Sequence, residues 1–273
     1  MPELPEVETV RRVLTPQLLG QRIESVEIVN PAVIARPQPD AFAAALLGRR
    51  ITATARRGKF LTLALDDGSR LTLHLRMTGC LLAAPAGTPR LAHTHLVLHL
   101  TDSELRFSDS RRFGRFWLLA PGEEDTFTGA ARLGPEPFDA ALTADYLRAK
   151  LGKSRRAIKS CLLDQSVIAG IGNIYSDEIL FAAGIRPTRP AARLRKKDWQ
   201  ALAWLIPERL AFFIDKNAID PADYLAGGGE DYRNTPFLQV YGRAGEPCPR
   251  CGTPLTQVVI GGRSSVFCRR CQR

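Results

Sequence analysis

Apolar residues alternate with polar or small ones in two pairs of short segments in the first half of the chain. One pair covers 61–65 and 71–75 and is joined by the polar residues DDGS at 66–69, while the other covers 95–100 and 104–107. Alternation with a period of two, interrupted by turn-forming residues, is typical of antiparallel hairpins with one buried face. The pattern therefore predicts an antiparallel β-sandwich in this half of the chain.

The beginning of the chain and most of its second half follow a helical period instead. Val7, Val10, Leu14 and Leu18 recur at the spacing of one helix face, which predicts a helix over 3–19 packed on the sandwich. From residue 143 onward the same spacing predicts helices at 146–151, 155–163, 174–183 and 197–216. Strands followed by helices in this way are typical of the α+β class.

A passage rich in proline and glycine at 133–137 separates the two patterns and marks a domain boundary. The run of glycines at 227–229 predicts a flexible loop before the last segment. We therefore expect a β-sandwich domain at 1–132, a linker at 133–142, a helical domain at 143–225, a flexible loop at 226–237 and a C-terminal hairpin at 238–273.

The cysteines are concentrated near the C-terminus. Four of the six lie in the last 26 residues, as Cys248-x2-Cys251 and, after sixteen residues, Cys268-x2-Cys271. Two such turns at the ends of a hairpin complete a tetrahedral shell of four thiolates, so the spacing predicts a zinc ribbon with one structural zinc ion. Two disulfides are the alternative, but they fit poorly with a chain that begins without a secretion signal. The other two cysteines are expected to be small core residues: Cys80 and Cys161.

The charge of the chain is unevenly distributed. Lysine and arginine outnumber aspartate and glutamate by 38 to 28, a net charge of +10, and residues 150–273 hold 20 basic against 11 acidic side chains. A basic half favours a polyanionic partner, although a merely basic solvent-facing surface is the simpler alternative. Because no apolar run approaches the roughly 20 residues that span a bilayer, we expect a cytoplasmic protein without membrane contact.

Pro2 gives the N-terminus a distinctive chemistry. An initiator methionine before a small residue is normally removed, which would leave Pro2 as a secondary amine. An α-amino group titrates near about 7.7–8.0, so part of it is a nucleophile at neutral pH, and attack on the anomeric carbon of a sugar would give an iminium ion. Glu3 and Glu6 follow at the start of the predicted helix, where the helix dipole alone also favours carboxylates. Glu3 is therefore a candidate general acid beside a candidate nucleophile.

Six separated blocks of the sequence carry a resemblance to a known family. They are PELPEVETV at 2–10, LHLRMTG at 73–79, DSRRFGR at 109–115, LLDQSVIAGIGNIYSDEILF at 162–181, LQVYGR at 238–243, and GGRSS at 261–265 ahead of Cys268. In this order they resemble the bacterial formamidopyrimidine-DNA glycosylases over nearly the whole chain.

The resemblance implies a base-excision repair enzyme. Such an enzyme removes oxidised purines, namely 8-oxoguanine and formamidopyrimidines, from duplex DNA and then cuts the strand by β,δ-elimination through a Schiff base. The resemblance makes Pro2 the nucleophile, Glu3 the residue that assists sugar ring opening, and Glu6 a positioning carboxylate. It also places Lys59 at the phosphate of the lesion and Arg263, midway through the zinc ribbon, at a further phosphate as members of the catalytic group.

A base that leaves the duplex leaves a space that the enzyme must fill. The resemblance assigns this task to Met77, Arg111 and Phe113, with Arg111 bound to the unpaired cytosine and Phe113 wedged into the adjacent base step. It also makes His74 a phosphate ligand, for which an ordinary strand residue is the alternative.

The second half of the chain resembles the family's helix–two-turn–helix DNA-binding element. A turn at 170–173 precedes a predicted helix, whose first amides can hold a phosphate. Asn173 is implied to be the phosphate ligand, and Tyr175 a neighbour that packs or contacts the DNA backbone. Lys153 is expected to add a basic contact, with Arg155 and Arg156 as equally available alternatives.

Two other interpretations remain open on the sequence. A sister family acts on oxidised pyrimidines, but Leu4 together with Met77, Arg111 and Phe113 fits the purine branch. A zinc-ribbon protein that only binds DNA would explain the charge and the cysteines but not Pro2 and the glutamates that follow it. We expect a monomer that binds double-stranded DNA containing oxidised bases or abasic sites. The loop at 227–236 matches no lid residue of the family, so none is assigned there.

Overall fold

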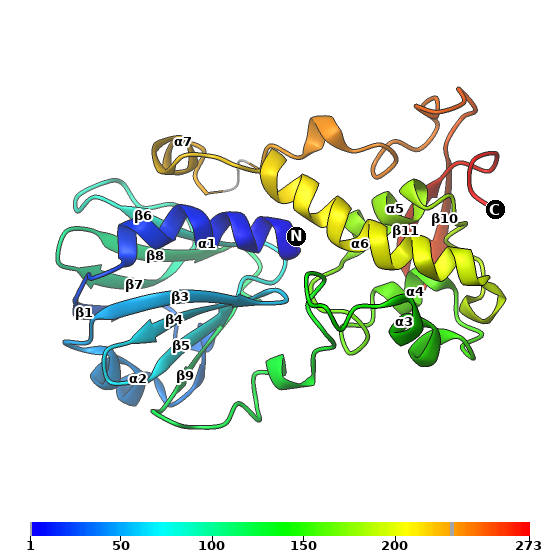
Figure 1. The fold of residues 1–273 in the computed structure, drawn as a ribbon. Helices are drawn as coiled ribbons and strands as arrows, with labels where there is room; N and C mark the ends of the chain where they lie inside the picture. Colours follow the sequence, from blue (N-terminus) through cyan, green and yellow to red (C-terminus); the bar gives the residue numbers. More distant parts are fainter. Residues whose placement is uncertain (1, 230–231) are drawn as a thin grey trace. The chain divides into compact units, whose positions relative to one another are not determined.

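The computed structural model describes residues 2–229 and 232–273, which form two compact units (Figure 1). The first unit comprises residues 1–131 and 217–233, and the second comprises 132–216 and 234–273. The sequence pattern places 217–225 with the helical domain, whereas the structure places this stretch with the sandwich. The reason is α7 (Pro221–Ala226), which is too short to bury a face of its own and inserts Tyr224 into the sandwich core, only 1% exposed.

The expected loop at 226–237 is divided between the two units. Gly228 and Gly229 turn the chain after α7 with φ angles of 65° and 77°, in the left-handed region that favours glycine. A Cβ added at Gly229 would lie 2.3 Å from the sulfur of Cys80, so this turn sits directly on the sandwich. Glu230 and Asp231 lie outside the described residues, and the 3-10 helix η4 (Thr235–Phe237) belongs to the second unit.

The first unit is a sandwich of two sheets. One sheet has the strand order β1-β7-β8-β6 and the other β2-β9-β5-β4-β3, and every pairing is antiparallel except that of β2 with β9. The leucines of the alternating pattern at 61–65 and 71–75 are at most 3% exposed, which confirms the predicted sandwich. The strands are β1 (Ile23–Ile28), β2 (Ile34–Arg36), β3 (Ile51–Arg57), β4 (Phe60–Leu65), β5 (Arg70–His74), β6 (Gly79–Ala84), β7 (Thr94–Leu100), β8 (Glu104–Asp109) and β9 (Arg115–Leu119).

Two helices cover the edges of the sandwich. α1 (Leu4–Leu18) packs against β3 and β6, the edge strands on one side of the two sheets, and α2 (Pro39–Leu46) packs against β1 and β2 on the other (Figure 1). α1 buries the apolar stripe that its sequence predicts, including Val7, Val10 and Leu14. Edge strands present backbone groups without a sheet partner, and a covering helix protects them. This arrangement brings α1 alongside β3.

The second unit contains the remaining helices and a short hairpin. α4 begins later than the sequence predicts, because Ala157 pairs with Pro190 and the amide of Ile158 donates to the carbonyl of Arg189 at 2.8 Å, so the chain before it is extended. The elements are α3 (Ala144–Leu151), α4 (Ile158–Leu162), α5 (Asn173–Ala182), α6 (Lys196–Lys216), β10 (Thr256–Ile260) and β11 (Arg263–Phe267). Short 3-10 helices complete the fold: η1 (Pro31–Val33) and η2 (Ala130–Arg132) precede this helical region, and η3 (Ala191–Arg193) lies within it. Among the described residues, no helix combines the length and apolar character that crossing a bilayer requires.

Candidate functional site

The start of α1 gathers the N-terminal candidates in a buried setting. Pro2 is buried, Glu3 is the N-cap with 0% exposure, and Glu6 is 2% exposed. Glu3 and Glu6 form a capping box, in which the amide of Glu3 donates to Oε2 of Glu6 at 2.8 Å. The carboxylates therefore stabilise the start of the helix and also lie next to Pro2 in the sequence, the residue predicted to be the nucleophile. Met1, whose removal the sequence predicts, lies outside the described residues.

Asn217 is a buried partner of Glu6 that the sequence does not reveal. Its Nδ2 donates to Oε1 of Glu6 at 3.3 Å, and the residue is 0% exposed. Its Oδ1 is buried and has no hydrogen-bond partner within the described chain. A buried amide oxygen without a partner costs free energy and is unusual in a native protein, which points to a task beyond packing. The two residues are 211 positions apart, so no local pattern could have paired them.

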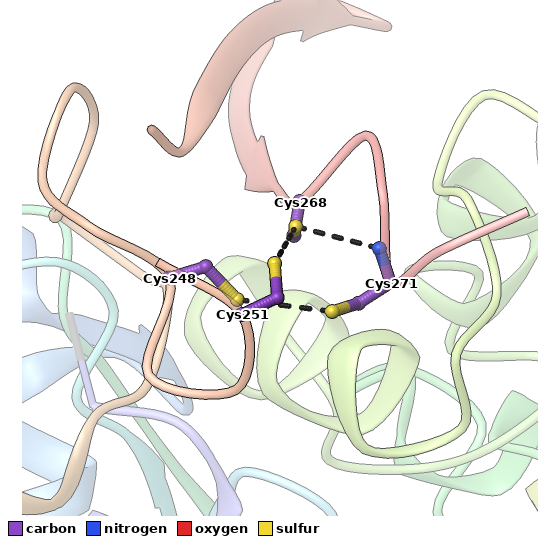
Figure 2. Close-up of side chains that lie close together, drawn as sticks. All are labelled: Cys248, Cys251, Cys268 and Cys271. Carbon is purple, nitrogen blue, oxygen red and sulfur yellow. Dashed lines mark hydrogen bonds between the residues drawn. The ribbon is translucent and has the colours of Figure 1, made fainter. Parts of the chain in front are cut away.

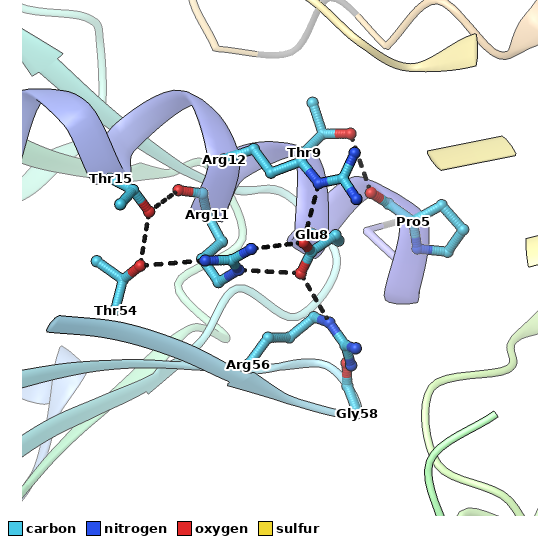
Figure 3. A network of polar contacts seen from close by, with 9 residues as sticks. All are labelled: Pro5, Glu8, Thr9, Arg11, Arg12, Thr15, Thr54, Arg56 and Gly58. Carbon is cyan, nitrogen blue, oxygen red and sulfur yellow. Dashed lines mark hydrogen bonds and ion pairs between the residues drawn. The ribbon is translucent and has the colours of Figure 1, made fainter. Parts of the chain in front are cut away.

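A cluster of arginines around Glu8 connects α1 to the turn that carries Lys59 (Figure 3). Oε2 of Glu8 accepts from Nε of Arg56 at 3.2 Å, and Nη1 of Arg56 donates to the carbonyl of Gly58 at 3.0 Å. Burial would raise the pKa of Glu8, but Arg11 above all, with Arg12 and Arg56, outweighs it and holds the pKa below its usual value. The ionised carboxylate thus fixes the β3–β4 turn, where Lys59 is partly exposed.

His74 ends β5 as a neutral imidazole. Its Nδ1 accepts from the amide of Arg76 at 2.9 Å, and its ring lies edge-on to Phe60, 4.8 Å between centroids. Burial, helped by the charges of Arg76 and Lys59, lowers the pKa of His74 to about 3. Because Nδ1 is an acceptor here, the proton of the neutral ring is on Nε2. His74 can therefore bind a phosphate as an uncharged Nε2–H donor.

The three residues assigned to filling the space in the duplex lie on two loops of the first unit. Met77 follows β5 and is 38% exposed, and Phe113 lies between β8 and β9 and is 46% exposed. The guanidinium of Arg111 lies 4.7 Å from the centroid of the Phe113 ring, a cation–π distance. Large apolar side chains that remain exposed beside an arginine are suited to contact with bases.

The N-terminus of α5 carries Asn173, as the resemblance implies. Gly172 is the N-cap and Asn173 the first helical residue, with a buried Oδ1 that has no hydrogen-bond partner among the described atoms. Gln165 stabilises the preceding turn, because its Oε1 accepts from the amide of Gly170 at 2.9 Å and its Nε2 donates to the carbonyl of Ile171 at 2.7 Å. The helix dipole and its first amides favour an anion at this position.

Tyr175 requires a correction. Its ring is 0% exposed and packs on Phe213 with 4.9 Å between centroids, and its hydroxyl accepts from Nδ2 of Asn234 at 2.7 Å. A side chain enclosed in this way cannot reach DNA, so of the two roles left open for Tyr175 the structure supports packing. The motif residue at this position is therefore part of the core beside α5 and not a ligand for DNA.

Basic side chains of the second unit also lie in the loop before α4 and at the tip of the ribbon hairpin. Lys153 and Arg155 are exposed, whereas Nη2 of Arg156 is engaged with Asp164 at 3.1 Å. Arg156 is therefore a weaker candidate for a phosphate contact than the other two. Arg263 is exposed and starts β11 directly after the glycine turn at 261–262, at the tip of the ribbon hairpin.

The four cysteines of the ribbon converge on one point (Figure 2). Their sulfur atoms all lie within 4.8 Å of one another, with Cys248 and Cys271 at 3.9 Å and Cys251 and Cys268 at 3.5 Å. Tetrahedral zinc with Zn–S bonds of about 2.3 Å places ligand sulfurs roughly 3.8 Å apart, so the cluster fits zinc. Cysteine binds zinc as the thiolate, so metal binding at this cluster releases protons.

Three family descriptions match successive parts of the chain. Residues 1–116 match the formamidopyrimidine-DNA glycosylase N-terminal domain, 133–220 match the H2TH domain of that glycosylase, and 245–273 match a zinc finger found in FPG and IleRS. The formamidopyrimidine-DNA glycosylase of Moorella thermoacetica is 50% identical over 259 residues, 94% of each chain. That of Geobacillus kaustophilus is 45% identical over 275 residues, the whole of both chains.

Solved structures of relatives contain DNA. The FPG of Lactococcus lactis bound to Fapy-dG DNA has a TM-score of 0.91 and 36% identity, over 99% of this chain and 100% of that one. The same protein with abasic-site DNA has a TM-score of 0.91 and 35% identity, over 99% of both chains. A further complex of that protein holds DNA with an oxidised pyrimidine, with a TM-score of 0.91 and 36% identity over the whole of both chains.

Proposed function

The chain belongs to the formamidopyrimidine-DNA glycosylase family, and from that premise we propose how its own residues carry out the reaction. It is a bifunctional DNA glycosylase and abasic-site lyase that acts on oxidised purines, formamidopyrimidine lesions and abasic sites in DNA. Its C-terminal ribbon holds one structural zinc ion through Cys248, Cys251, Cys268 and Cys271.

We propose that the secondary amine of Pro2 attacks C1′ of the damaged nucleotide. The bond between C1′ and the base breaks as the new C1′–N bond forms; the base leaves with the electron pair and takes up a proton, and Pro2 loses its N–H proton. Protonation of the sugar ring oxygen by Glu3 then breaks the C1′–O bond, and the nitrogen lone pair forms the iminium ion. The observation that supports these roles is the buried start of α1, where Pro2, Glu3 and Glu6 are consecutive or one turn apart and sheltered from water. Glu6, held by Asn217, positions the base to be removed.

The iminium ion makes the later strand cleavage feasible. It acidifies the C2′ hydrogen, whose removal breaks the bond to the 3′ phosphate, and a second elimination breaks the bond to the 5′ phosphate. We assign the neutralisation of these phosphates to Lys59 on its braced turn and to Arg263 at the ribbon tip. His74 and Asn173 bind further phosphates, and Lys153 adds an exposed positive charge.

We further propose that Met77, Arg111 and Phe113 fill the space that the everted base leaves. Their exposure on loops supports this role, and an oxidised purine opposite cytosine gives Arg111 its partner. We propose that the protein works as a monomer in the cytoplasm, where bacterial DNA is located. Size-exclusion chromatography of the protein alone and with duplex DNA tests the monomer.

Borohydride trapping tests the central proposal. The protein is incubated with a duplex that carries 8-oxoguanine opposite cytosine, reduced, and mapped by peptide mass spectrometry; we expect the adduct on Pro2. The Pro2→Gly variant should form the covalent adduct with DNA more slowly and release the damaged base more slowly. The Pro16→Gly variant, which replaces an exposed proline of the same helix, should behave like the wild type in both measurements. Normal base release by a protein whose Pro2 amine is chemically blocked would refute the mechanism.

The same assay separates the other interpretations. An adduct only with an oxidised pyrimidine would move the protein to the sister activity. Tight binding without an adduct on 8-oxoguanine, on an oxidised pyrimidine or on an abasic site would indicate a protein that only binds DNA.

A further inference from the structure

Asp109, the last residue of β8, carries a buried carboxylate that bonds to both loops with exposed apolar tips. The residue is 1% exposed. Its Oδ1 accepts from the hydroxyl of Thr78, which neighbours Met77, and from the amide of Arg111 at 3.1 Å. Its Oδ2 accepts from the amide of Gly114 at 2.7 Å. One carboxylate therefore links the loop after β5 to the loop before β9.

The backbone of Asp109 is itself held on both sides. Its amide donates to the carbonyl of His93 at 3.0 Å, and its carbonyl lies 2.8 Å from Nε2 of His95, which is 5% exposed. Within the sheet Asp109 is opposite Gly79, the first residue of β6. The carboxylate thus projects from a fixed point of the sandwich rather than from a mobile loop.

The electrostatics agree with this geometry. Burial alone would raise the pKa of Asp109, but hydrogen bonds from Thr78 and from the amides of Gly114, Arg111 and Phe113 outweigh burial and lower it below its usual value. The group is therefore an ionised acceptor at neutral pH, and hydrogen bonds to an ionised acceptor are shorter and stronger than neutral ones.

Close packing at two glycines restricts the conformation of both loops, the one after β5 and the one between β8 and β9. A Cβ added at Gly114 would lie 2.3 Å from the Phe107 ring, so only glycine can pass between that ring and the Asp109 carboxylate. A Cβ added at Gly79 would lie 2.3 Å from the carbonyl of Leu75, which closes the first loop equally tightly. Both loops are compact turns around a common centre.

We propose that Asp109 is a positioning residue that aligns the loops of Met77 and of Arg111 and Phe113 with each other before DNA binds. The inference rests on the proposed role of these three side chains in filling the duplex. Met77 and Phe113 must enter the same space in the duplex as Arg111, so the distance between the two loops has to be fixed. If the loops are ordered before DNA binds, the entropic cost of ordering them is not added to base eversion. Asp109 touches neither substrate nor reacting atoms and acts only through the residues that it holds.

Two substitutions test the proposal. Asp109→Asn keeps the size but replaces an ionised acceptor by an amide whose NH2 group opposes the loop amides. Thr78→Val leaves Asp109 in place with its bonds to the amides of Arg111 and Gly114, but it removes the bond from Thr78 to Asp109 and the direct bond from the amide of Arg111 to the Thr78 hydroxyl at 3.3 Å, so it separates the two loops and remains informative if Asp109→Asn folds poorly. Asp102→Asn, the same change at an exposed turn between β7 and β8, is the matched control.

Single-turnover cleavage of two substrates separates positioning from stability. On duplex 8-oxoguanine, we expect Asp109→Asn to lower the rate roughly 10- to 100-fold, the range for misplaced catalytic or substrate-contacting groups, and Thr78→Val to lower it less. The preference for cytosine over adenine opposite the lesion should narrow, because Arg111 is no longer fixed. A single strand with an abasic site has no space to fill, so its cleavage should stay within about twofold of the wild type, as should all activities of Asp102→Asn.

Fluorescence of 2-aminopurine placed beside the lesion adds a direct measure of wedge insertion, and we expect a smaller increase in both variants. An equal loss on both substrates would show that Asp109 only stabilises the fold, and an unchanged opposite-base preference with unchanged duplex rates would overturn the proposal outright. Failure of the wild type to cleave the abasic strand would instead refute the proposed lyase mechanism, independently of Asp109.

Discussion

The ion pair of Lys159 and Asp177 is buried in the second unit and attaches the zinc ribbon to the helical element. Nζ of Lys159, with 0% of its side chain exposed, donates to Oδ1 of Asp177 at 2.7 Å and to the carbonyl of Ser264 at 2.9 Å. The carboxylate also accepts from the hydroxyl of Ser265 at 2.7 Å and from the amide of Val266 at 2.9 Å. Since β11 begins at Arg263, this network holds the strand that carries the proposed phosphate ligand.

We predict that Lys159→Met destabilises the second unit by about 3–5 kcal/mol, the range for removing one partner of a buried ion pair. Methionine nearly matches the length of lysine, so the loss comes from the charge left on Asp177 and from the carbonyl of Ser264 without its donor, rather than from a cavity. Adding Asp177→Asn should restore part of the loss, because no uncompensated charge then remains.

The loss of stability caused by Lys159→Met should be larger at high pH than at low pH. Burial raises the pKa of Asp177 in the folded chain, and Lys159 is the main group that opposes this rise, so its removal raises the pKa further. A carboxyl group whose pKa is higher in the folded than in the unfolded chain contributes stability that is present at low pH and is lost as pH rises through the folded value. Lys159→Met should therefore be less destabilised at pH 5 than at pH 8.

Hydrogen exchange measured by mass spectrometry on peptides from α5 and β11 reports the second unit separately from the first. Lys153→Met removes an exposed lysine of the same unit and should change stability by less than about 0.5 kcal/mol. A loss below about 1 kcal/mol for Lys159→Met, or an equal loss at pH 5 and pH 8, would refute the reasoning.

The remaining predictions concern zinc, His74 and salt. Cys248→Ser should release zinc, unfold the ribbon and weaken DNA binding while the first unit stays folded, as measured by metal analysis, DNA titration and hydrogen exchange; wild-type affinity after zinc loss would contradict it. His74 has a pKa of about 3 in the folded chain and stays neutral there, whereas in the unfolded chain it binds a proton below about pH 6.5, which favours unfolding. Between pH 7 and pH 5, urea unfolding should therefore show a smaller loss of stability for His74→Gln than for the wild type. An equal loss would argue against a neutral His74. Raising salt from 50 to 200 mM should weaken binding of undamaged and damaged duplexes by a similar factor in a filter or fluorescence assay; a loss confined to damaged DNA would point to the first unit as the source of the salt dependence.

Patterns with a fixed local period could be predicted from the sequence. The leucine alternation at 61–65 and 71–75 predicted two strands, which pair as β4 and β5. The apolar stripe from Val7 to Leu18 predicted α1, and the spacing of the four ribbon cysteines predicted that their sulfur atoms converge. Each depends on neighbours within one element or one hairpin, where geometry follows directly from spacing.

Features that depend on distant partners could not be predicted in this way. α7 has the composition of a helix but nothing local says which core receives Tyr224, and it is the sandwich. Asp109 resembles any polar residue at a strand end, and its importance appears only when Thr78 and the amide of Gly114 are seen to converge on it. The same holds for Asn217 beside Glu6. Buried polar groups are recognised by their partners, and the partners here come from other elements.

The charge of the two units explains why composition suggested a DNA partner without suggesting the reaction. The second unit holds 21 basic and 10 acidic side chains, a net charge of +11, and the first holds 17 and 18, a net charge of −1, which together give the +10 of the chain. Attraction to phosphates is independent of base sequence and grows with the number of cations that displace counterions, so we expect most of it to arise in the second unit. In the mechanism that we propose, recognition of a damaged base instead depends on apolar tips at a fixed separation and on a sheltered nucleophile. The nearly neutral sandwich holds the buried carboxylates to which we assign these tasks: Glu3, Glu6 and Asp109. Substitutions in the second unit should therefore change affinity for all DNA, and substitutions around Asp109 should change the preference for the base opposite the lesion.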